Sequence, residues 1–186
     1  LFRSKWDLGW TTNGFLAGLV AITAPCYWVS PTGAFIIGIV AAFVVIWVTD
    51  LLEYIRIDDP IGAVPVHLAC GIWGTLSLGL FATGQYGLPT PMGVDTSTVI
   101  KGLFYGGGAA QLISQAIGSG AVVLATLAVS VVLMYGVKAT GTLRVSREGE
   151  LEGLDLHEHG MMAYPEFVIH AGGAPHLAAT DPKLRG

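Results

Sequence analysis

Long apolar stretches with almost no polar face dominate the pattern of hydrophobic and polar positions along this chain. They cover approximately residues 12–29, 32–52, 61–82 and 109–137. Each is near or above the roughly 20 residues that a helix needs to cross about 30 Å of hydrocarbon, and none shows the alternation of a barrel strand over about ten residues. The pattern therefore predicts an all-α integral membrane protein with four transmembrane helices, rather than the partly polar helices of a water-soluble domain.

Composition supports the membrane prediction. Of the 186 residues, 53% are hydrophobic and only 12% are charged, and the mean hydropathy is +0.65, whereas a soluble domain carries about 25% charged residues. The formal net charge of −4 gives no reason to expect a nucleic-acid partner. Cys26 and Cys70 lie at different predicted membrane depths, which argues against a disulfide, and no zinc-type spacing is present. We therefore predict no metal or cofactor.

Basic residues between the stretches predict the orientation. Four crossings place both chain ends on one side of the membrane, and Lys101 is the basic residue close to a crossing on the other side. The side with both ends carries Arg3, Lys5, Arg56, Lys138, Arg144 and Arg147. Because loops rich in Lys and Arg stay in the cytoplasm, both ends are predicted to be cytoplasmic, in a multi-pass protein of the plasma membrane.

Three parts follow from this arrangement. Residues 1–140 form the predicted transmembrane region, 141–164 a water-soluble cytoplasmic tail, and 165–186 a flexible C-terminus without periodicity. The segment 83–108 is rich in Gly and Pro, so we expect it to fold over the outer mouth of the helices rather than to span. The chain begins at Leu1, not Met, and its opening differs from a signal peptide, so we expect a piece of a longer protein.

His67 is an ionisable side chain inside the third apolar stretch. In the loop before it, Asp58 is followed by Asp59 and Pro60, which predict a helix start with an N-cap and Pro at the first helical position. Counted from Pro60, His67 lies roughly 10 Å into the membrane, where an ionisable group indicates a functional site. Desolvation keeps such an imidazole neutral, so it offers one donor and one acceptor nitrogen to a proton or a small polar solute.

Two interpretations of His67 stay open from position alone. It could be a structural histidine, hydrogen-bonded to a neighbouring helix, or it could line a narrow channel. The channel is favoured because Ala63, His67 and Gly71 share a helix face at i, i+4 spacing, which leaves small residues beside the ring. Pro65 lacks a backbone N–H and so frees a carbonyl, for which a pore water or a polar solute could be the partner.

Other chemistry is not indicated by the sequence. His157 and His159 form a lone pair in a charged tail, where solvated side chains are a more ordinary interpretation than a metal site. The sequence has no nucleophile with a neighbouring base and no phosphate-binding glycine loop. An enzyme is therefore not predicted.

Three blocks of the sequence resemble the ammonium transporter family, which includes the Rhesus proteins. They are NGFLAGLVAIT at Asn13–Thr23, DDPIGAVPVHLACGIWG at Asp58–Gly74, and GTLRVSREGELEGLDLHEHG at Gly141–Gly160, followed by Ala163 and Tyr164. The second and third blocks are highly specific. The third resembles the ammonium transporter branch rather than the Rhesus branch.

The resemblance extends to Tyr164 and corresponds to the last four of the family's eleven helices. It implies a homotrimer with one narrow apolar pore in each subunit and a cytoplasmic C-terminus. Two histidines line that pore, and His67 matches the second, while the first histidine, the paired phenylalanine gate and the outer aromatic site belong to preceding helices. Leu68, where many members have Gly, and Gly62, where some bacterial members have Asp, depart from the family pattern.

Ammonium transport is the function that the resemblance implies. In that mechanism ammonium loses its proton at the pore entrance and neutral ammonia crosses, with His67 as hydrogen-bond partner and proton relay and Ala63 lining the pore below it. One alternative is an ammonium sensor that signals through its tail, which is disfavoured because only about twenty residues follow Tyr164. The other is a channel for neutral gases, ammonia or carbon dioxide, as in the Rhesus relatives.

The tail is predicted to regulate by packing beneath the subunits and coupling them, with an inert solvated extension as the alternative. The family's cytoplasmic face binds trimeric P-II signal proteins that block the pore, so such a protein is a candidate partner. The tail residues that carry the family pattern are Arg144, Gly153, Leu154, Asp155, His159, Gly160 and Tyr164. Gly153 and Gly160 are expected to provide turns.

Overall fold

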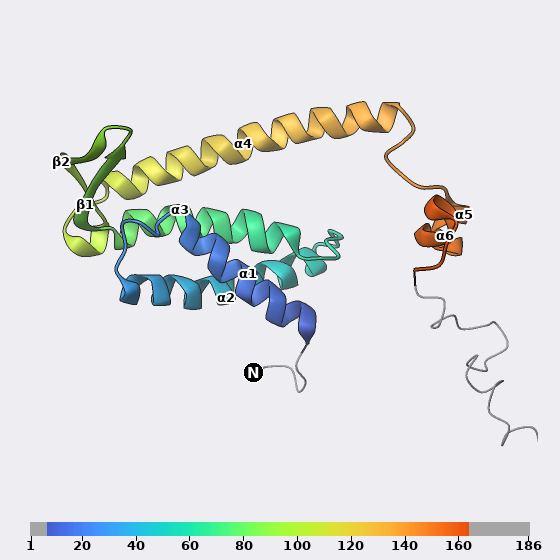
Figure 1. The fold of residues 1–186 in the computed structure, drawn as a ribbon, viewed down its shortest axis with the longest axis horizontal. Coiled ribbons are helices and arrows are strands. Elements are labelled where there is room, and N and C mark those ends of the chain that lie inside the picture. Colours follow the sequence, from blue (N-terminus) through green and yellow to red (C-terminus); the bar gives the residue numbers. More distant parts are fainter. Residues whose placement is uncertain (1–6, 164–186) are drawn as a thin grey trace, which may run out of the picture. The chain divides into compact units, whose positions relative to one another are not determined.

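A computed structural model describes residues 7–163, which are mostly helical (Figure 1). The chain divides into two compact units, Leu1–Leu127 and Ala128–Gly186, and each is considered by itself. The predicted flexible C-terminus at 165–186 lies outside the described residues. His67 lies in the first unit.

The first two helices begin at side-chain caps that the sequence supplies. α1 spans Leu8–Thr23, where the Asp7 side chain accepts from the Trp10 N–H, and α2 spans Pro31–Tyr54, where Ser30 accepts from the Gly33 N–H. An oxygen of this kind satisfies a donor that has no partner within the helix. α1 ends at Thr23, not near 29 as predicted, because Pro25 has no N–H with which to continue the helical hydrogen bonds.

The third helix begins about one turn later than predicted. It consists of a π-helical segment, η1 (Val64–Ala69), followed by α3 (Cys70–Phe81). Pro60 lies in a turn closed by the bond from the Gly62 N–H to the Asp59 carbonyl. Gly62 has a φ of 73°, which a right-handed helix cannot include. The prediction that Pro60 is the first helical residue is therefore wrong, and the depth of His67 in the membrane stays a prediction.

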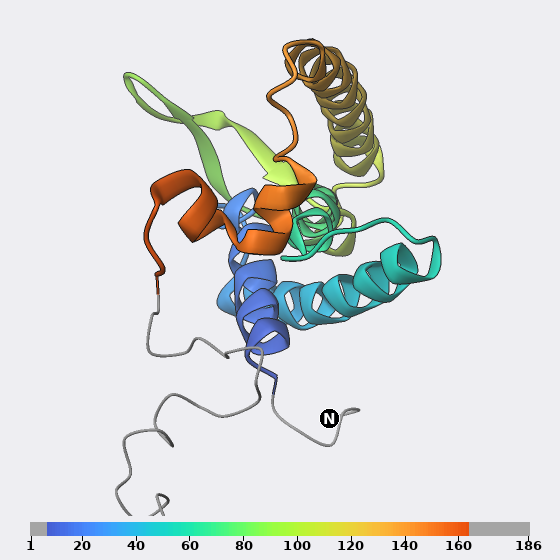
Figure 2. The same cartoon turned by 90° about the vertical axis from the view of Figure 1, so that its right-hand side faces the viewer.

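The connection after α3 contains a β-hairpin, which the all-α prediction missed. β1 (Thr83–Thr90) and β2 (Gly93–Lys101) pair antiparallel, with an irregular register along the ladder. Figure 2 shows the two strands extending away from α3. A short 3₁₀ segment, η2 (Leu103–Tyr105), leads on to α4 (Ala110–Ala139). This segment is ordered by strand pairing, and its place over the outer mouth of the helices stays a prediction.

Three helices in the described part of the chain are long and apolar enough to cross a membrane: Pro31–Tyr54, Val64–Phe81 and Ala110–Ala139. The 16 residues of α1 fall short of the roughly 20 that a perpendicular crossing needs. The helical membrane architecture predicted from the sequence is thus found, and the fourth crossing stays a prediction.

Small residues form the contact between α1, α2 and the third helix. The fully buried side chains there include Ala17, Ala21 and Ala41, which let backbones approach closely. Cys70 is also fully buried, and its Sγ lies 3.7 Å from the Ala41 carbonyl oxygen. Cys70 of the third helix therefore contacts the backbone of α2, and the exposed face of the third helix lies elsewhere.

The second unit contains two short helices in the predicted tail. α5 spans Arg147–Glu152 and α6 spans Leu154–His159. Gly153 lies between them with a φ of 104°, and Gly160 ends α6 with a φ of 66°. Both values are in the region that glycine adopts without a steric penalty.

Candidate functional site

His67 lies on the exposed side of η1. Ala63, one residue before η1, is exposed as well, and Gly71 is half-buried. Val66 and Cys70 point into the core, with exposed fractions of 2% and 0%. The structure therefore brings the two predicted pore residues to one face of the third helix, away from α1 and α2.

The imidazole of His67 has no hydrogen-bond partner within residues 7–163. A structural histidine tied to one of the helices described here would need such a bond, and that alternative finds no support in this part of the chain. The ring thus keeps one donor and one acceptor nitrogen available on the exposed face.

Asp59 caps the helix that carries His67, although the helix starts later than predicted. Its Oδ1 accepts the N–H of Ala63 at 2.9 Å, and its Oδ2 accepts the N–H of Val64 at 2.8 Å. Two charge-assisted bonds from one carboxylate hold the first turn rigidly. Asp59 therefore positions the backbone that leads into the predicted pore residues.

The backbone oxygen of Ile61, just before this helix, accepts a hydrogen bond from α1. The donor is the side chain of Asn13, with Nδ2 3.2 Å from the Ile61 oxygen. The expectation that a carbonyl freed by Pro65 bonds a pore water or a solute stays a prediction. Asn13 is a functional candidate that the sequence analysis missed, and its one signal is a carboxamide within an apolar stretch.

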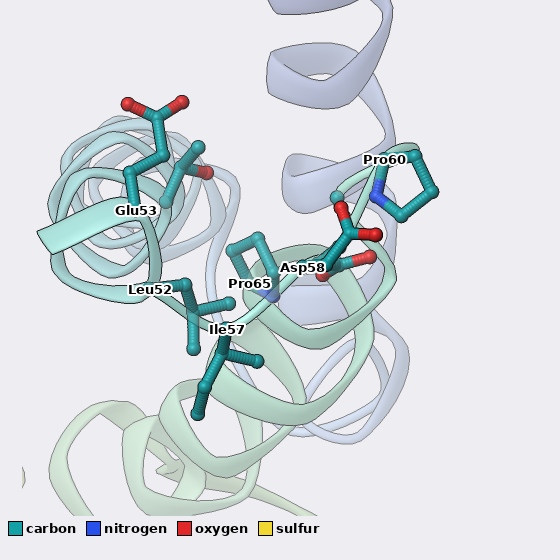
Figure 3. Close-up of a pocket in the computed structure, with 9 residues that line it drawn as sticks. Leu52, Glu53, Ile57, Asp58, Pro60 and Pro65 are labelled. Atoms are coloured by element: carbon teal, nitrogen blue, oxygen red, sulfur yellow. The ribbon is translucent and has the colours of Figure 1, made fainter. Parts of the chain in front are cut away.

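A cleft of about 260 Å³ lies between the C-terminal turn of α2 and the loop that follows it. Figure 3 shows Glu53 of α2 on one side and Asp58 and Pro60 of the loop on the other. Its lining consists of Thr49, Leu52, Glu53, Ile57, Asp58, Asp59, Pro60, Gly62 and Pro65. The three predicted loop residues thus come together, but neither Ala63 nor His67 lines this cleft.

The tail residues form a compact arrangement around Asp155. Its Oδ2 accepts the N–H of Ala163 at 2.8 Å. This bond, a second from the Leu156 N–H and the nearby His159 hold the pKa of the Asp155 carboxyl below its usual value of 3.8. In addition, Nδ1 of His157 lies 3.2 Å from a carboxylate oxygen of Glu152, which links α6 to α5.

The remaining predicted tail residues lie at the ends of these elements. Arg144 is exposed ahead of α5, Leu154 is the first residue of α6 and His159 is its last. Tyr164 lies outside the described residues. Within residues 7–163, no group of three or more His, Cys, Asp or Glu side chains is arranged to hold a metal ion.

Comparison with known proteins gives a consistent result. The profile of the Ammonium Transporter Family matches residues 1–164. The chain is 43% identical to ammonium transporter Amt2 of Archaeoglobus fulgidus, over 90% of this chain and 35% of that protein. It is 36% identical to putative ammonium transporter 1 member 5 of Arabidopsis thaliana, over 98% and 37%, and 35% identical to ammonium transporter Amt1 of Haloferax mediterranei, over 97% and 32%. The chain spans about a third of the length of these relatives.

Proposed function

This chain belongs to the ammonium transporter family, and we propose that it forms part of a pore that conducts ammonium or ammonia across the plasma membrane. The observation that carries this proposal is the exposed imidazole of His67, which has no partner in residues 7–163 and shares its face with Ala63. In a transporter with preceding helices, that face is the one available to line a passage.

The physical chemistry of ammonium accounts for a histidine at this position. A bare cation in a dry apolar tube is costly, and potassium has a similar size and charge, so size alone cannot separate the two ions. Ammonium, unlike potassium, can release a proton. A neutral imidazole then donates to or accepts from ammonia and passes the proton along, while Ala63 leaves space beside the ring.

The wider assembly follows from the same proposal. The chain supplies the last four of eleven helices in each subunit of a homotrimer, with both ends of this segment in the cytoplasm. The tail, through Arg144, Gly153, Asp155 and Gly160, couples the subunits beneath the membrane. A trimeric P-II type protein is the partner proposed for the cytoplasmic face.

Replacement of His67 by alanine tests the pore role. We expect the full-length His67→Ala protein, reconstituted in liposomes, to lose most of its ammonium-driven current or its exclusion of potassium. Leu68→Ala is the matched control, because Leu68 is the exposed neighbour on the same helix and should keep both properties. Wild-type current together with wild-type potassium exclusion in His67→Ala would overturn the relay role.

The two alternatives make different predictions in the same liposomes. A gas channel would alter internal pH through ammonia flux without a substrate-dependent current. A sensor would bind ammonium with neither flux nor current. An ammonium-driven current through the wild-type protein therefore distinguishes transport from both a gas channel and a sensor.

A further inference from the structure

The bond between Asn13 and Ile61 joins α1 to the residues just before the helix of His67. The N–H of Val66 donates to the Gly62 oxygen at 3.1 Å as the first bond of that helix, so the Ile61 oxygen lies ahead of the helix and is not one of its intrahelical acceptors. Asn13 donates to the Ile61 oxygen from a different helix, 48 positions earlier in the sequence. A backbone carbonyl in an apolar setting needs such a partner.

The contact is close enough to define the position of the loop. Gly62, next to Ile61, has a φ of 73°, and a Cβ placed on it would lie 2.5 Å from Nδ2 of Asn13. No larger residue could bring this backbone as near to the carboxamide. On the other side of the same turn, Asp59 holds the N–H groups of Ala63 and Val64. The entry into η1 is thus fixed from both sides.

From this geometry we infer that Asn13 is a positioning residue for His67. The inference rests on the proposed function. The carboxamide of Asn13 holds the start of the π-helical segment against α1, and this contact sets the position of the His67 imidazole in the passage. Asn13 itself does not touch the solute in this account. Its effect on transport is transmitted through the backbone between Ile61 and His67.

Two variants of Asn13 and one of its neighbour Thr12 isolate the role of the donor group. Asn13→Leu keeps the approximate size but cannot donate, and Asn13→Asp keeps the shape but presents only acceptors to the Ile61 carbonyl. Both should lower the ammonium-driven current of the full-length protein in liposomes about tenfold per folded trimer, which corresponds to about 1.4 kcal/mol for the lost bond. Thr12→Val is the matched control, because Thr12 is exposed on the same helix and should match wild type.

The His67→Ala background separates positioning from general folding. If Asn13 acts through the imidazole, Asn13→Leu should not lower the residual current of His67→Ala any further, whereas a general loss of packing would lower both. Further loss in that background would overturn the positioning role. Should His67→Ala conduct like wild type, the relay proposal fails instead, and should Asn13→Leu alone conduct like wild type, only the present inference fails.

Discussion

The indole Nε1 of Trp73 donates to the carbonyl oxygen of Ile37 at 3.0 Å, which ties α3 to the middle of α2. Neither group has water nearby in a membrane, so this bond has no solvent substitute. We expect Trp73→Phe to lower the free energy of unfolding of the full-length protein in detergent by about 1 kcal/mol, from the lost bond. Trp47→Phe is the control, because Trp47 is 67% exposed on α2 and should change stability little.

Close backbone packing at Gly74 leads to a second expectation. A Cβ placed on Gly74 would lie 2.5 Å from the carbonyl oxygen of Ala21, so α1 and α3 would have to move apart. Gly74→Ala should therefore destabilise the protein by about 1–3 kcal/mol. At Gly38, a Cβ meets nothing within 4 Å, and Gly38→Ala should be neutral or stabilising through helix propensity. Thermal unfolding of both variants in the same detergent checks the contrast.

Predictions from the apolar pattern succeeded where local sequence determines the structure. The stretches that became α2 and α4 were located to within about two residues, since their length and apolar composition are local features. His67 and Ala63 were placed on one helix face by spacing alone, and the structure leaves both exposed. Asp59 does accept N–H groups at the start of the helix, but from Ala63 and Val64 rather than as the residue directly before the first helical position.

The predictions that failed concern features that depend on contacts between segments distant in the sequence. The late start of the third helix requires Gly62 in a left-handed conformation against Asn13, and no local rule pairs those two residues. The bond from Asn13 to the Ile61 oxygen could not be predicted, because the position of α1 beside this loop is not a local feature. The hairpin between Thr83 and Lys101 was not predicted, since glycine and proline are depleted in strands.

A left-handed residue after α2 gives a third expectation. Arg56 has a φ of 60°, and bonds from the Arg56 N–H to the Glu53 oxygen and from the Ile57 N–H to the Leu52 oxygen close the helix end. Glycine is the usual residue at this position of the motif. Arg56→Gly should raise the free energy of unfolding by about 0.5–1 kcal/mol, after the entropy cost of glycine is subtracted. Glu53→Gly, inside the helix, should lower it by about 1 kcal/mol.

The carboxylate of Asp155 should make the tail sensitive to acid. The Ala163 and Leu156 N–H groups and His159 lower the pKa of Asp155 from 3.8, so the charged form is the one that the folded tail stabilises. The stabilisation is therefore complete above the unfolded pKa and is lost as the pH falls through the lower, folded value. An NMR titration of the full-length protein should show the Ala163 amide proton shifting with a midpoint below 3.8.

Asp155→Asn supplies the control for that titration, because its carboxamide does not titrate and the Ala163 amide should then show no transition in the same range. The pair of Glu152 and His157 provides an internal comparison, since their contact joins α5 to α6 without touching Ala163. Glu152→Gln should leave the Ala163 midpoint in place. A midpoint at or above 3.8 in the wild-type protein would show that the bond between Asp155 and Ala163 does not hold the end of the tail in solution.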